Sequence, residues 1–159
     1  MSHPGVELAE YSVAVRESSL KRLRRVPVGF ENWRPSSGAL SLSELARHIL
    51  AADEWFFRKL EDPSLRRMVA CVGEGGPLSR AEFDDVLVRL EASGRRRAEL
   101  LSSLANEDLS RLIRDDRFGK EVTVWWLAVR GNLDHEAHHR GQIATYIRLL
   151  EDQGLRRDG

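Results

Sequence analysis

Hydrophobic positions recur at intervals of three or four residues in four long stretches of the chain, with polar residues between them. This spacing places apolar side chains on one face of a helix and predicts four amphipathic helices. The predicted helices cover about residues 4–25, 41–60, 79–104 and 124–152. Pro4 suits the first turn of the first helix, and Gly154 suits the end of the last.

Two of these helices carry a recognisable start signal. Ser41 and Ser79 are each followed three residues later by a glutamate, which is the capping-box pattern. In a capping box, the two side chains bond to backbone N–H groups that lack a partner at a helix start. Gly94, in the middle of the third predicted helix, costs roughly 1 kcal/mol relative to alanine. We therefore expect it to mark a close helix crossing.

The segments between the predicted helices are rich in residues that interrupt helices. Residues 26–40 are predicted to form a loop and residues 61–78 a long connection, because each contains several Pro and Gly residues. Residues 106–120 are polar, and 121–124 have the composition of a short extended piece. The chain of 159 residues is thus predicted to be a single all-α domain over residues 1–159 with a four-helix-bundle fold.

Charge and composition narrow the classes of partner. Basic and acidic residues each number 25, so no net charge draws the chain to nucleic acid or to a membrane surface. The run Arg95-Arg96-Arg97 is interpreted as a solvated helix face. No apolar run spans a bilayer, and the N-terminus lacks a secretory pattern. The single cysteine, Cys71, has no intramolecular disulfide partner and is expected to be inert. These features predict a cytoplasmic protein without nucleic-acid or membrane partners.

The last predicted helix has two adjacent stripes that we expect to face the interior. The first stripe contains Trp125, Ala128, Asn132, His135, His139, Gln142, Tyr146 and Leu150. The second contains Trp126, Val129, Leu133, Glu136, Ile143 and Ile147. His138 lies on a third stripe, with Leu127 and Gly131, which we interpret as small and polar. His138 is therefore expected to lie outside the core.

Three inward histidines form a candidate metal site. His135 and His139 are four residues apart on one helix face and can share one metal ion. His48 lies on the inward side of the second predicted helix and offers a third ligand. Burying three imidazoles demands a partner for each ring, and a metal satisfies three nitrogens at once. The alternative, polar core histidines satisfied by protein neighbours, stays open at this point.

The stretch HEAHH at 135–139 also contains the H-E-x-x-H pattern of zinc metalloproteases, with Glu136 as the general base. Such an enzyme needs a third ligand well downstream, yet only 20 residues follow His139, and Glu151 is the sole candidate before the tail. The longer form of the motif needs glycine and histidine where this chain has Gln142 and Thr145. The protease interpretation is rejected.

A carboxylate-bridged site with two metal ions is the other alternative within a helix bundle. Glu136 and His139 supply one Glu-x-x-His pair. The fold class requires a second pair from another helix, but Glu44 is followed three residues later by Arg47. This interpretation is also rejected, and the prediction is a single metal bound by His48, His135 and His139.

The residues around these histidines resemble the DinB/YfiT-like family. The resemblance lies in LSELARHIL at 42–50, which contains His48, and in NLDHEAHHRGQI at 132–143. The second segment matches the family's His-x-x-x-His-Arg-Gly-Gln run from His135 to Gln142. The NWRP turn at 32–35 is similar to the segment that precedes the second helix in relatives. The resemblance covers nearly the whole chain.

This resemblance implies a bundle of up-down-down-up topology with a long crossover between the second and third helices. It also implies one divalent transition metal, zinc or nickel among others, and a homodimer. The last predicted helix has more apolar surface than packing within one bundle would bury, which also favours a dimer. Relatives in the family use low-molecular-weight thiols such as mycothiol and bacillithiol, which implies a metal-activated thiol and a small-molecule substrate.

Three functions stay open. A site with three protein ligands keeps at least one open position, which can activate water for hydrolysis or a small thiol for S-transfer or isomerisation. A metal-binding stress protein without turnover is the third. Gln142 is expected to line the pocket or to orient a ligand ring, and Arg140 to form an ion pair with Glu136 or another helix. The tryptophans at 55, 125 and 126 are expected to fill the core or a dimer interface.

Overall fold

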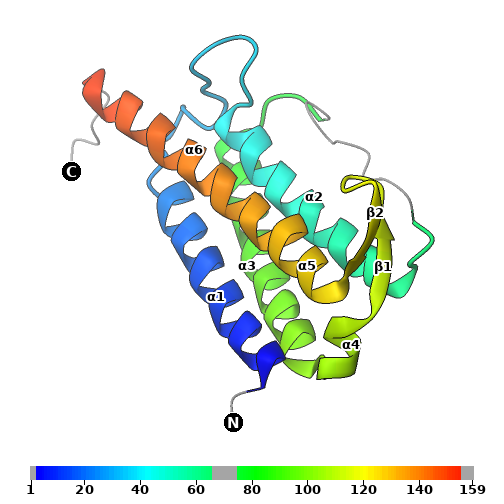
Figure 1. Ribbon diagram of the computed structural model, residues 1–159. Coiled ribbons are helices and arrows are strands. Elements are labelled where there is room, and N and C mark those ends of the chain that lie inside the picture. Colours follow the sequence, from blue (N-terminus) through cyan, green and yellow to red (C-terminus); the bar gives the residue numbers. More distant parts are fainter. Residues whose placement is uncertain (1–2, 66–74, 155–159) are drawn as a thin grey trace.

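The computed structural model describes residues 3–65 and 75–154, in which four long helices lie side by side (Figure 1). These are α1 (Pro4–Leu23), α2 (Leu42–Glu61), α3 (Arg80–Ser103) and α6 (Asp134–Asp152). α1 and α6 run in one direction and α2 and α3 in the other (Figure 1), so the parallel helices α2 and α3 are joined by a crossover. The all-α, up-down-down-up bundle is confirmed. Within the described residues, no helix has the length and apolar character needed to cross a membrane.

The helix starts follow from the local sequence. Ser41 and Ser79 accept hydrogen bonds from the backbone N–H groups of Glu44 and Glu82, and both glutamates bond back to the serine N–H. The two capping boxes are therefore confirmed. The first three predicted helices agree with the observed boundaries to within two residues at either end, whereas the long helix α6 begins at Asp134 rather than at about residue 124. Cys71 lies outside the described residues.

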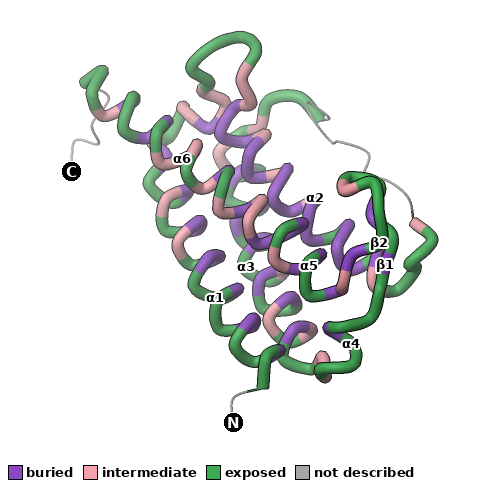
Figure 2. Tube along the Cα trace, viewed as in Figure 1, coloured by how far each residue is buried: buried purple, intermediate pink, exposed green. Residues whose placement is uncertain are grey.

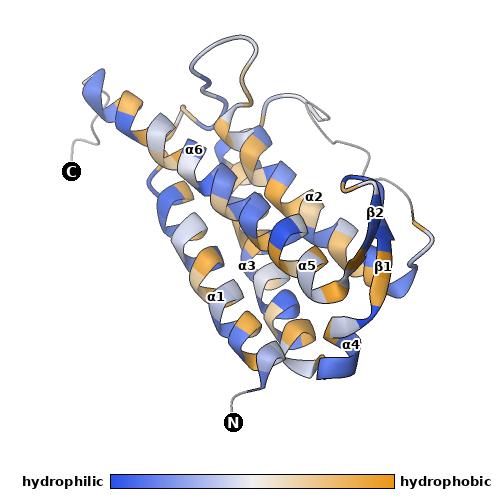
Figure 3. Cartoon of the chain, viewed as in Figure 1, coloured by the Kyte–Doolittle hydropathy of each residue, from blue (hydrophilic) through white to orange (hydrophobic). Residues whose placement is uncertain are grey.

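The interior of the bundle has two apolar clusters with polar residues between them. Buried residues lie on the faces that the helices turn toward one another (Figure 2), and these faces carry much of the hydrophobic colour in Figure 3. One cluster joins the C-terminal end of α1 and α6 to the N-terminal halves of α2 and α3. The other joins the N-terminal part of α1 and the C-terminal parts of α2 and α3 to apolar residues between Leu109 and Leu133. The layer between the clusters contains the buried polar residues Ser12, Arg16, His48, Asp53, Arg97, Asn132, Glu136 and His139.

A small hairpin and a short helix close one end of the bundle. Helix α4 (Asn106–Ser110) precedes strands β1 (Leu112–Asp115) and β2 (Lys120–Thr123), which pair antiparallel. Ile113 lies opposite Val122 in this pairing, and both side chains are buried in the second apolar cluster. The extended piece predicted at 121–124 is thus confirmed, whereas α4 and β1 were not predicted.

The last helical segment differs from the predicted regular helix. Helix α5 (Val124–Ala128) leads into a π-helical turn, η1 (Val129–Leu133), before α6 begins. The turn is closed by the N–H of Asp134 donating to the carbonyl of Val129, five residues earlier. A π-turn holds one residue more than an α-turn, which rotates everything upstream by about 100° relative to a regular helix.

This rotation overturns part of the helical-wheel prediction. Trp125 and Trp126 were expected to face the interior, but they are 43% and 39% exposed. Leu127 and Gly131, assigned to a polar outer stripe, are buried. Downstream of the turn the predicted faces hold, because His139, Ile143 and Ile147 are buried and His138 is exposed.

Candidate metal centre

Three histidines from two helices converge at one point in the polar layer. The Nε2 atom of His135 lies 2.9 Å from Nε2 of His48 and 3.0 Å from Nε2 of His139. The three rings meet edge to face, with centroids 4.4–4.7 Å apart. One nitrogen of each ring lies within 4.8 Å of the others, so the group can hold a metal ion. These are the three residues predicted as ligands.

The convergence follows from helix geometry. His135 and His139 lie one turn apart on α6 and therefore share a face. His48 reaches them from α2, which packs antiparallel to α6 (Figure 1). The exposed ring of His138 contacts His139 edge to face, with centroids 5.1 Å apart, and does not belong to the converging group. The structure thus separates the three inner histidines from His138.

Gln142 determines which nitrogen of His139 carries the proton. Its side-chain oxygen lies 2.6 Å from Nδ1 of His139. An amide oxygen only accepts hydrogen bonds, so Nδ1–H is the donor and Nε2 presents a lone pair to the other two histidines. An outer residue that fixes the tautomer of a histidine is typical of metal sites. Of the roles expected for Gln142, orientation of a ligand ring matches this contact.

The rings of His48 and His135 have hydrogen-bond partners among the described residues only at Nε2. The Nδ1 atoms of His48 and His135 are buried and have no hydrogen-bond partner within the described ranges. Burial lowers the pKa of all three histidines, and the positive charge of protonated neighbours adds to this effect for His135 and His139. The pKa falls to about 3 for His135 and to about 4 for His139. All three imidazoles are therefore neutral at pH 7, the form that binds metals.

The arrangement fits a divalent transition metal. In a tetrahedral zinc site with metal–nitrogen distances of 2.0–2.1 Å, the ligand nitrogens lie about 3.3 Å apart. The observed spacings of 2.9 and 3.0 Å are close to that separation. Calcium and magnesium prefer oxygen ligands, whereas imidazole suits zinc, nickel, copper and iron. The three Nε2 atoms could therefore hold a cation of this class.

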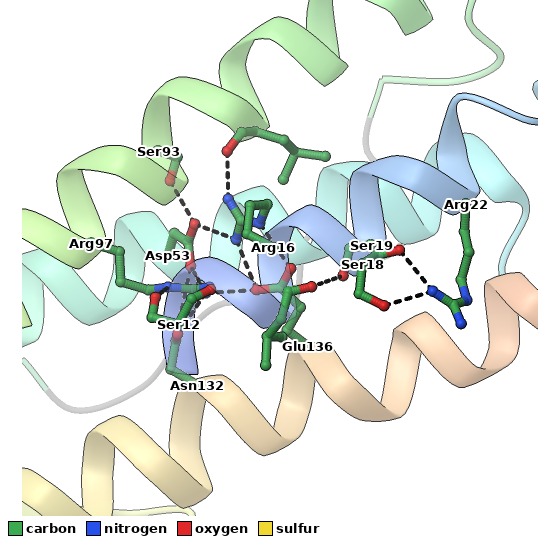
Figure 4. A network of polar contacts seen from close by, with 12 residues as sticks. Ser12, Arg16, Ser18, Ser19, Arg22, Asp53, Ser93, Arg97, Asn132 and Glu136 are labelled. Atoms are coloured by element: carbon green, nitrogen blue, oxygen red, sulfur yellow. Dashed lines mark hydrogen bonds and ion pairs between the residues drawn. The ribbon is translucent and has the colours of Figure 1, made fainter. Parts of the chain in front are cut away.

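Glu136 has no part in this group. Its carboxylate accepts hydrogen bonds from Nε of Arg16 at 2.8 Å and from Nη1 of Arg97 at 2.7 Å (Figure 4). The structure therefore agrees with rejection of the protease interpretation, in which Glu136 faces the metal. The structural ion pair expected for Glu136 is present, but with Arg16 and Arg97 rather than Arg140.

A closed ionic network surrounds Glu136. Asp53 on α2 accepts from Arg16 at 2.7 Å and from Arg97 at 2.9 Å, so both arginines join both carboxylates (Figure 4). Asn132 and Ser12 supply further bonds to Arg97. Burial opposes ionisation of Asp53 and Glu136, yet the two arginines hold the pKa of each carboxyl below its ordinary value. Two positive and two negative charges thus balance in the core.

Most of this network was missed from the sequence. Arg97 belongs to the arginine run assigned to a solvated face, but it is fully buried, so that assignment was wrong for this residue. Arg16 offered a signal, since it lies among the buried positions Ser12, Val15, Ser19 and Leu20 on the inward face of α1. Gly94 was expected at a close helix crossing. A Cβ atom there would lie 2.7 Å from Cγ of Arg16, which confirms the close approach of α1.

Comparisons with known proteins agree with this architecture. The family model described as the DinB superfamily matches residues 12–143. The crystal structure of a DinB-like protein, YjoA from Bacillus subtilis, is similar with a TM-score of 0.69 and 21% identity, over 91% of this chain and 92% of that one. A search of curated proteins found no match. The structural likeness shows the fold, and the family match covers most of the chain, which therefore belongs to the DinB superfamily.

Proposed function

We propose that the chain is a metal-dependent enzyme that binds one divalent transition metal, zinc or nickel, through His48, His135 and His139. The observation that carries this proposal is the convergence of three Nε2 atoms, with His135 at 2.9 Å from His48 and at 3.0 Å from His139. Neutral imidazole nitrogens gathered at one point are a typical donor set for a transition metal.

A small thiol is the proposed co-reactant. A divalent metal held by three neutral imidazoles keeps its full charge of about +2, favours an anionic ligand and lowers the pKa of a coordinated thiol so that it reacts as a thiolate. The chain has one cysteine, Cys71. The thiol is therefore proposed to come from outside, as mycothiol or bacillithiol does in relatives, and to attack a small electrophilic substrate.

The protein's own residues support this choice over hydrolysis. Glu136 lies between His135 and His139 along α6, and its two oxygens accept hydrogen bonds from Arg16 and Arg97. It is thus not placed to take a proton from water. Gln142 orients His139 through its contact with Nδ1. His135 is half-buried, which leaves a route from solvent for small molecules.

The test is metal-dependent consumption of thiol. The protein is loaded with zinc or nickel and offered an electrophile together with mycothiol, bacillithiol or another low-molecular-weight thiol. We expect one thiol to be consumed by the loaded wild type and by His138→Ala, and not by His139→Ala. His138→Ala is the matched control, because it removes the neighbouring histidine that does not converge on the site.

Two other outcomes would replace the proposal. Hydrolysis of an ester or amide without thiol would assign the site to a metal-dependent hydrolase. Metal binding without turnover of any substrate in a broad panel would assign the chain to non-catalytic metal binding in a stress response. Absence of metal binding by the wild-type chain would reject all three versions.

The exposed tryptophans support the proposal of a homodimer. Trp125 and Trp126 lie beside the hairpin, and Leu112 of β1 is also an exposed large hydrophobic residue. Trp126 and Leu112 line the same surface pocket. Large apolar side chains gathered on one surface are typical of protein–protein contacts. A monomeric mass in light scattering at micromolar concentration would contradict the dimer.

A further inference from the structure

The ionic network lies next to the histidines on both helices that carry them. Asp53 follows His48 by five residues on α2, and Glu136 follows His135 directly on α6. At 1.5 Å per residue, Asp53 lies about 7.5 Å further along α2 than His48. The network and the histidines therefore occupy neighbouring levels of the same helix pair.

Each arginine connects the two ligand-bearing helices. Arg16 donates to Asp53 on α2 and to Glu136 on α6, and Arg97 does the same (Figure 4). Asn132, at the end of the π-turn, adds a bond to Asp53 at 3.2 Å and accepts one from Arg97 at 2.9 Å. The arginines come from α1 and α3, so all four long helices meet here.

Directional bonds are needed at this level because apolar packing does not fix the rotation of a helix. Hydrophobic burial is non-directional and tolerates small rotations and shifts of α6 against α2. Charge-assisted hydrogen bonds require donor–acceptor distances of about 2.7–2.9 Å. A metal site requires its ligand distances to within about 0.2 Å. The network supplies the missing constraint one turn from the ligands.

We infer that Arg16 and Arg97, acting through Asp53, Asn132 and Glu136, set the rotation and axial register of α6 against α2 so that the three Nε2 atoms converge. These five are positioning residues and do not touch the metal. The inference rests on the proposed metal binding for its affinity test, but its structural consequence holds in the metal-free protein.

The first test compares two substitutions that each remove one uncharged partner of Arg97. Asn132→Ala removes the partner on the ligand-bearing segment, and Ser12→Ala removes the hydroxyl partner on α1, which carries no ligand. Competition with a chromophoric chelator measures zinc affinity well below the unfolding temperature. We expect Asn132→Ala to bind zinc about 10- to 100-fold more weakly, as for other outer residues of metal sites, and Ser12→Ala to bind like the wild type. Equal affinities in both variants overturn the inference.

The second test separates positioning from stability. The double variant Arg16→Met/Glu136→Leu removes one positive and one negative charge and leaves Arg97 paired with Asp53. Replacing a buried ion pair by apolar residues is often neutral or stabilising. We expect its unfolding midpoint in urea to match or exceed that of the wild type while zinc affinity falls at least about tenfold. A stable double variant with wild-type affinity overturns the inference.

A crystal structure of the metal-free double variant decides the question independently of metal binding. We expect its three histidine nitrogens no longer to lie within 4.8 Å of one another, as they do in the wild type. Unchanged convergence overturns the inference. Failure of the wild type to bind zinc, with loss of convergence in the variant, would instead reject the proposed function and leave the positioning role supported.

Discussion

Two polar clusters in one layer of the bundle differ in how they are satisfied. In the ionic network, two arginines and two carboxylates balance one another, and every carboxylate oxygen accepts at least one hydrogen bond. In the histidine cluster, three neutral rings turn Nε2 atoms toward a common point, and two of them leave Nδ1 without a partner within the described ranges. The first cluster is closed within the protein, whereas the second offers three nitrogens that could hold a metal ion.

This difference separates architecture from a binding site. Buried polar groups are costly, so a cluster that closes on itself stabilises the relative placement of its helices. A cluster whose nitrogens converge on one point without a closed set of bonds offers a place for a ligand. The two clusters are therefore expected to respond differently to substitution, metal and acid.

The largest effect is expected from breaking the network. Arg97→Met leaves two buried carboxylates with one arginine, and removal of one partner of a buried pair costs about 3–5 kcal/mol. Arg96→Met is the matched control, because the side chain of Arg96 is 61% exposed and pairs with Glu61 at the surface. We expect that control to lose less than about 1 kcal/mol. Urea denaturation of the metal-free variants measures both, and equal losses would contradict the contrast.

Substitution of a histidine ligand is expected to remove the stabilisation that zinc provides, rather than to destabilise the metal-free protein. Zinc at 100 times its dissociation constant stabilises a protein by about 2.7 kcal/mol. We expect this rise in thermal stability for the wild type and His138→Ala, and none for His139→Ala. Elemental analysis of the purified variants provides a second measurement. Zinc retained by His139→Ala, or lost from His138→Ala, would refute the assigned ligands.

Acid is expected to affect the two clusters in separate pH windows. The pKa is lowered to about 3 for His135 and to about 4 for His139, while the unfolded chain binds protons near pH 6.5. Between these values the unfolded state holds more protons, so the stability of the metal-free protein falls as the pH drops from about 6.5 toward 4. Asp53 and Glu136 also have lowered pKa values. Their contribution to the stability is therefore lost only as the pH falls below the ordinary pKa of a carboxyl group, about 4.

The measurement is the urea midpoint of the metal-free protein at a series of pH values. The variant His135→Ala/His139→Ala is the control, and its stability should change less between pH 6.5 and 4. A urea midpoint of the wild type that rises as the pH is lowered from 6.5 to 4 would contradict this prediction.

The smallest effect is expected from two helix glycines. A methyl group at Gly94 would lie 2.7 Å from Cγ of Arg16 and would disturb the network, whereas Gly141 on α6 has no described atom within 4 Å of the added Cβ. We expect Gly94→Ala to destabilise by about 1–3 kcal/mol, the usual cost of overpacking. Gly141→Ala should stabilise by about 0.4–1 kcal/mol, since alanine restricts the unfolded chain. Thermal unfolding of both variants distinguishes them.

The fold was largely accessible from the sequence because its signals are local. Capping boxes, helix-breaking residues and the spacing of apolar positions each depend on a few neighbours, and they predicted all four long helices. The inner histidines were accessible for a similar reason. His135 and His139 share a face within one helix, and His48 lies on an apolar face of another.

The network was hidden because its partners are far apart in the sequence. Arg97 bonds Asp53 and Glu136, 44 and 39 residues away, and nothing in a run of three arginines indicates which one turns inward. The orientation of the tryptophans failed for another reason. The wheel assumed a regular α-helix from 124 to 152, and the π-turn between Ala128 and Asp134 has no spacing signal of its own.

The π-turn also affects how this chain is compared with its relatives. One extra residue lies between the exposed tryptophans and the histidines, and the helical hydrogen bonding continues through it. Loss of one residue from a π-turn restores a regular α-helix, so a relative with a regular helix here needs a one-residue gap in any alignment with this chain. Without that gap, the buried Leu127 of this chain would be matched to a neighbouring position on another face. An alignment of this chain with such a relative therefore needs one register for the hairpin end and another, shifted by one residue, for the histidine end. The change of register lies within residues 129–133.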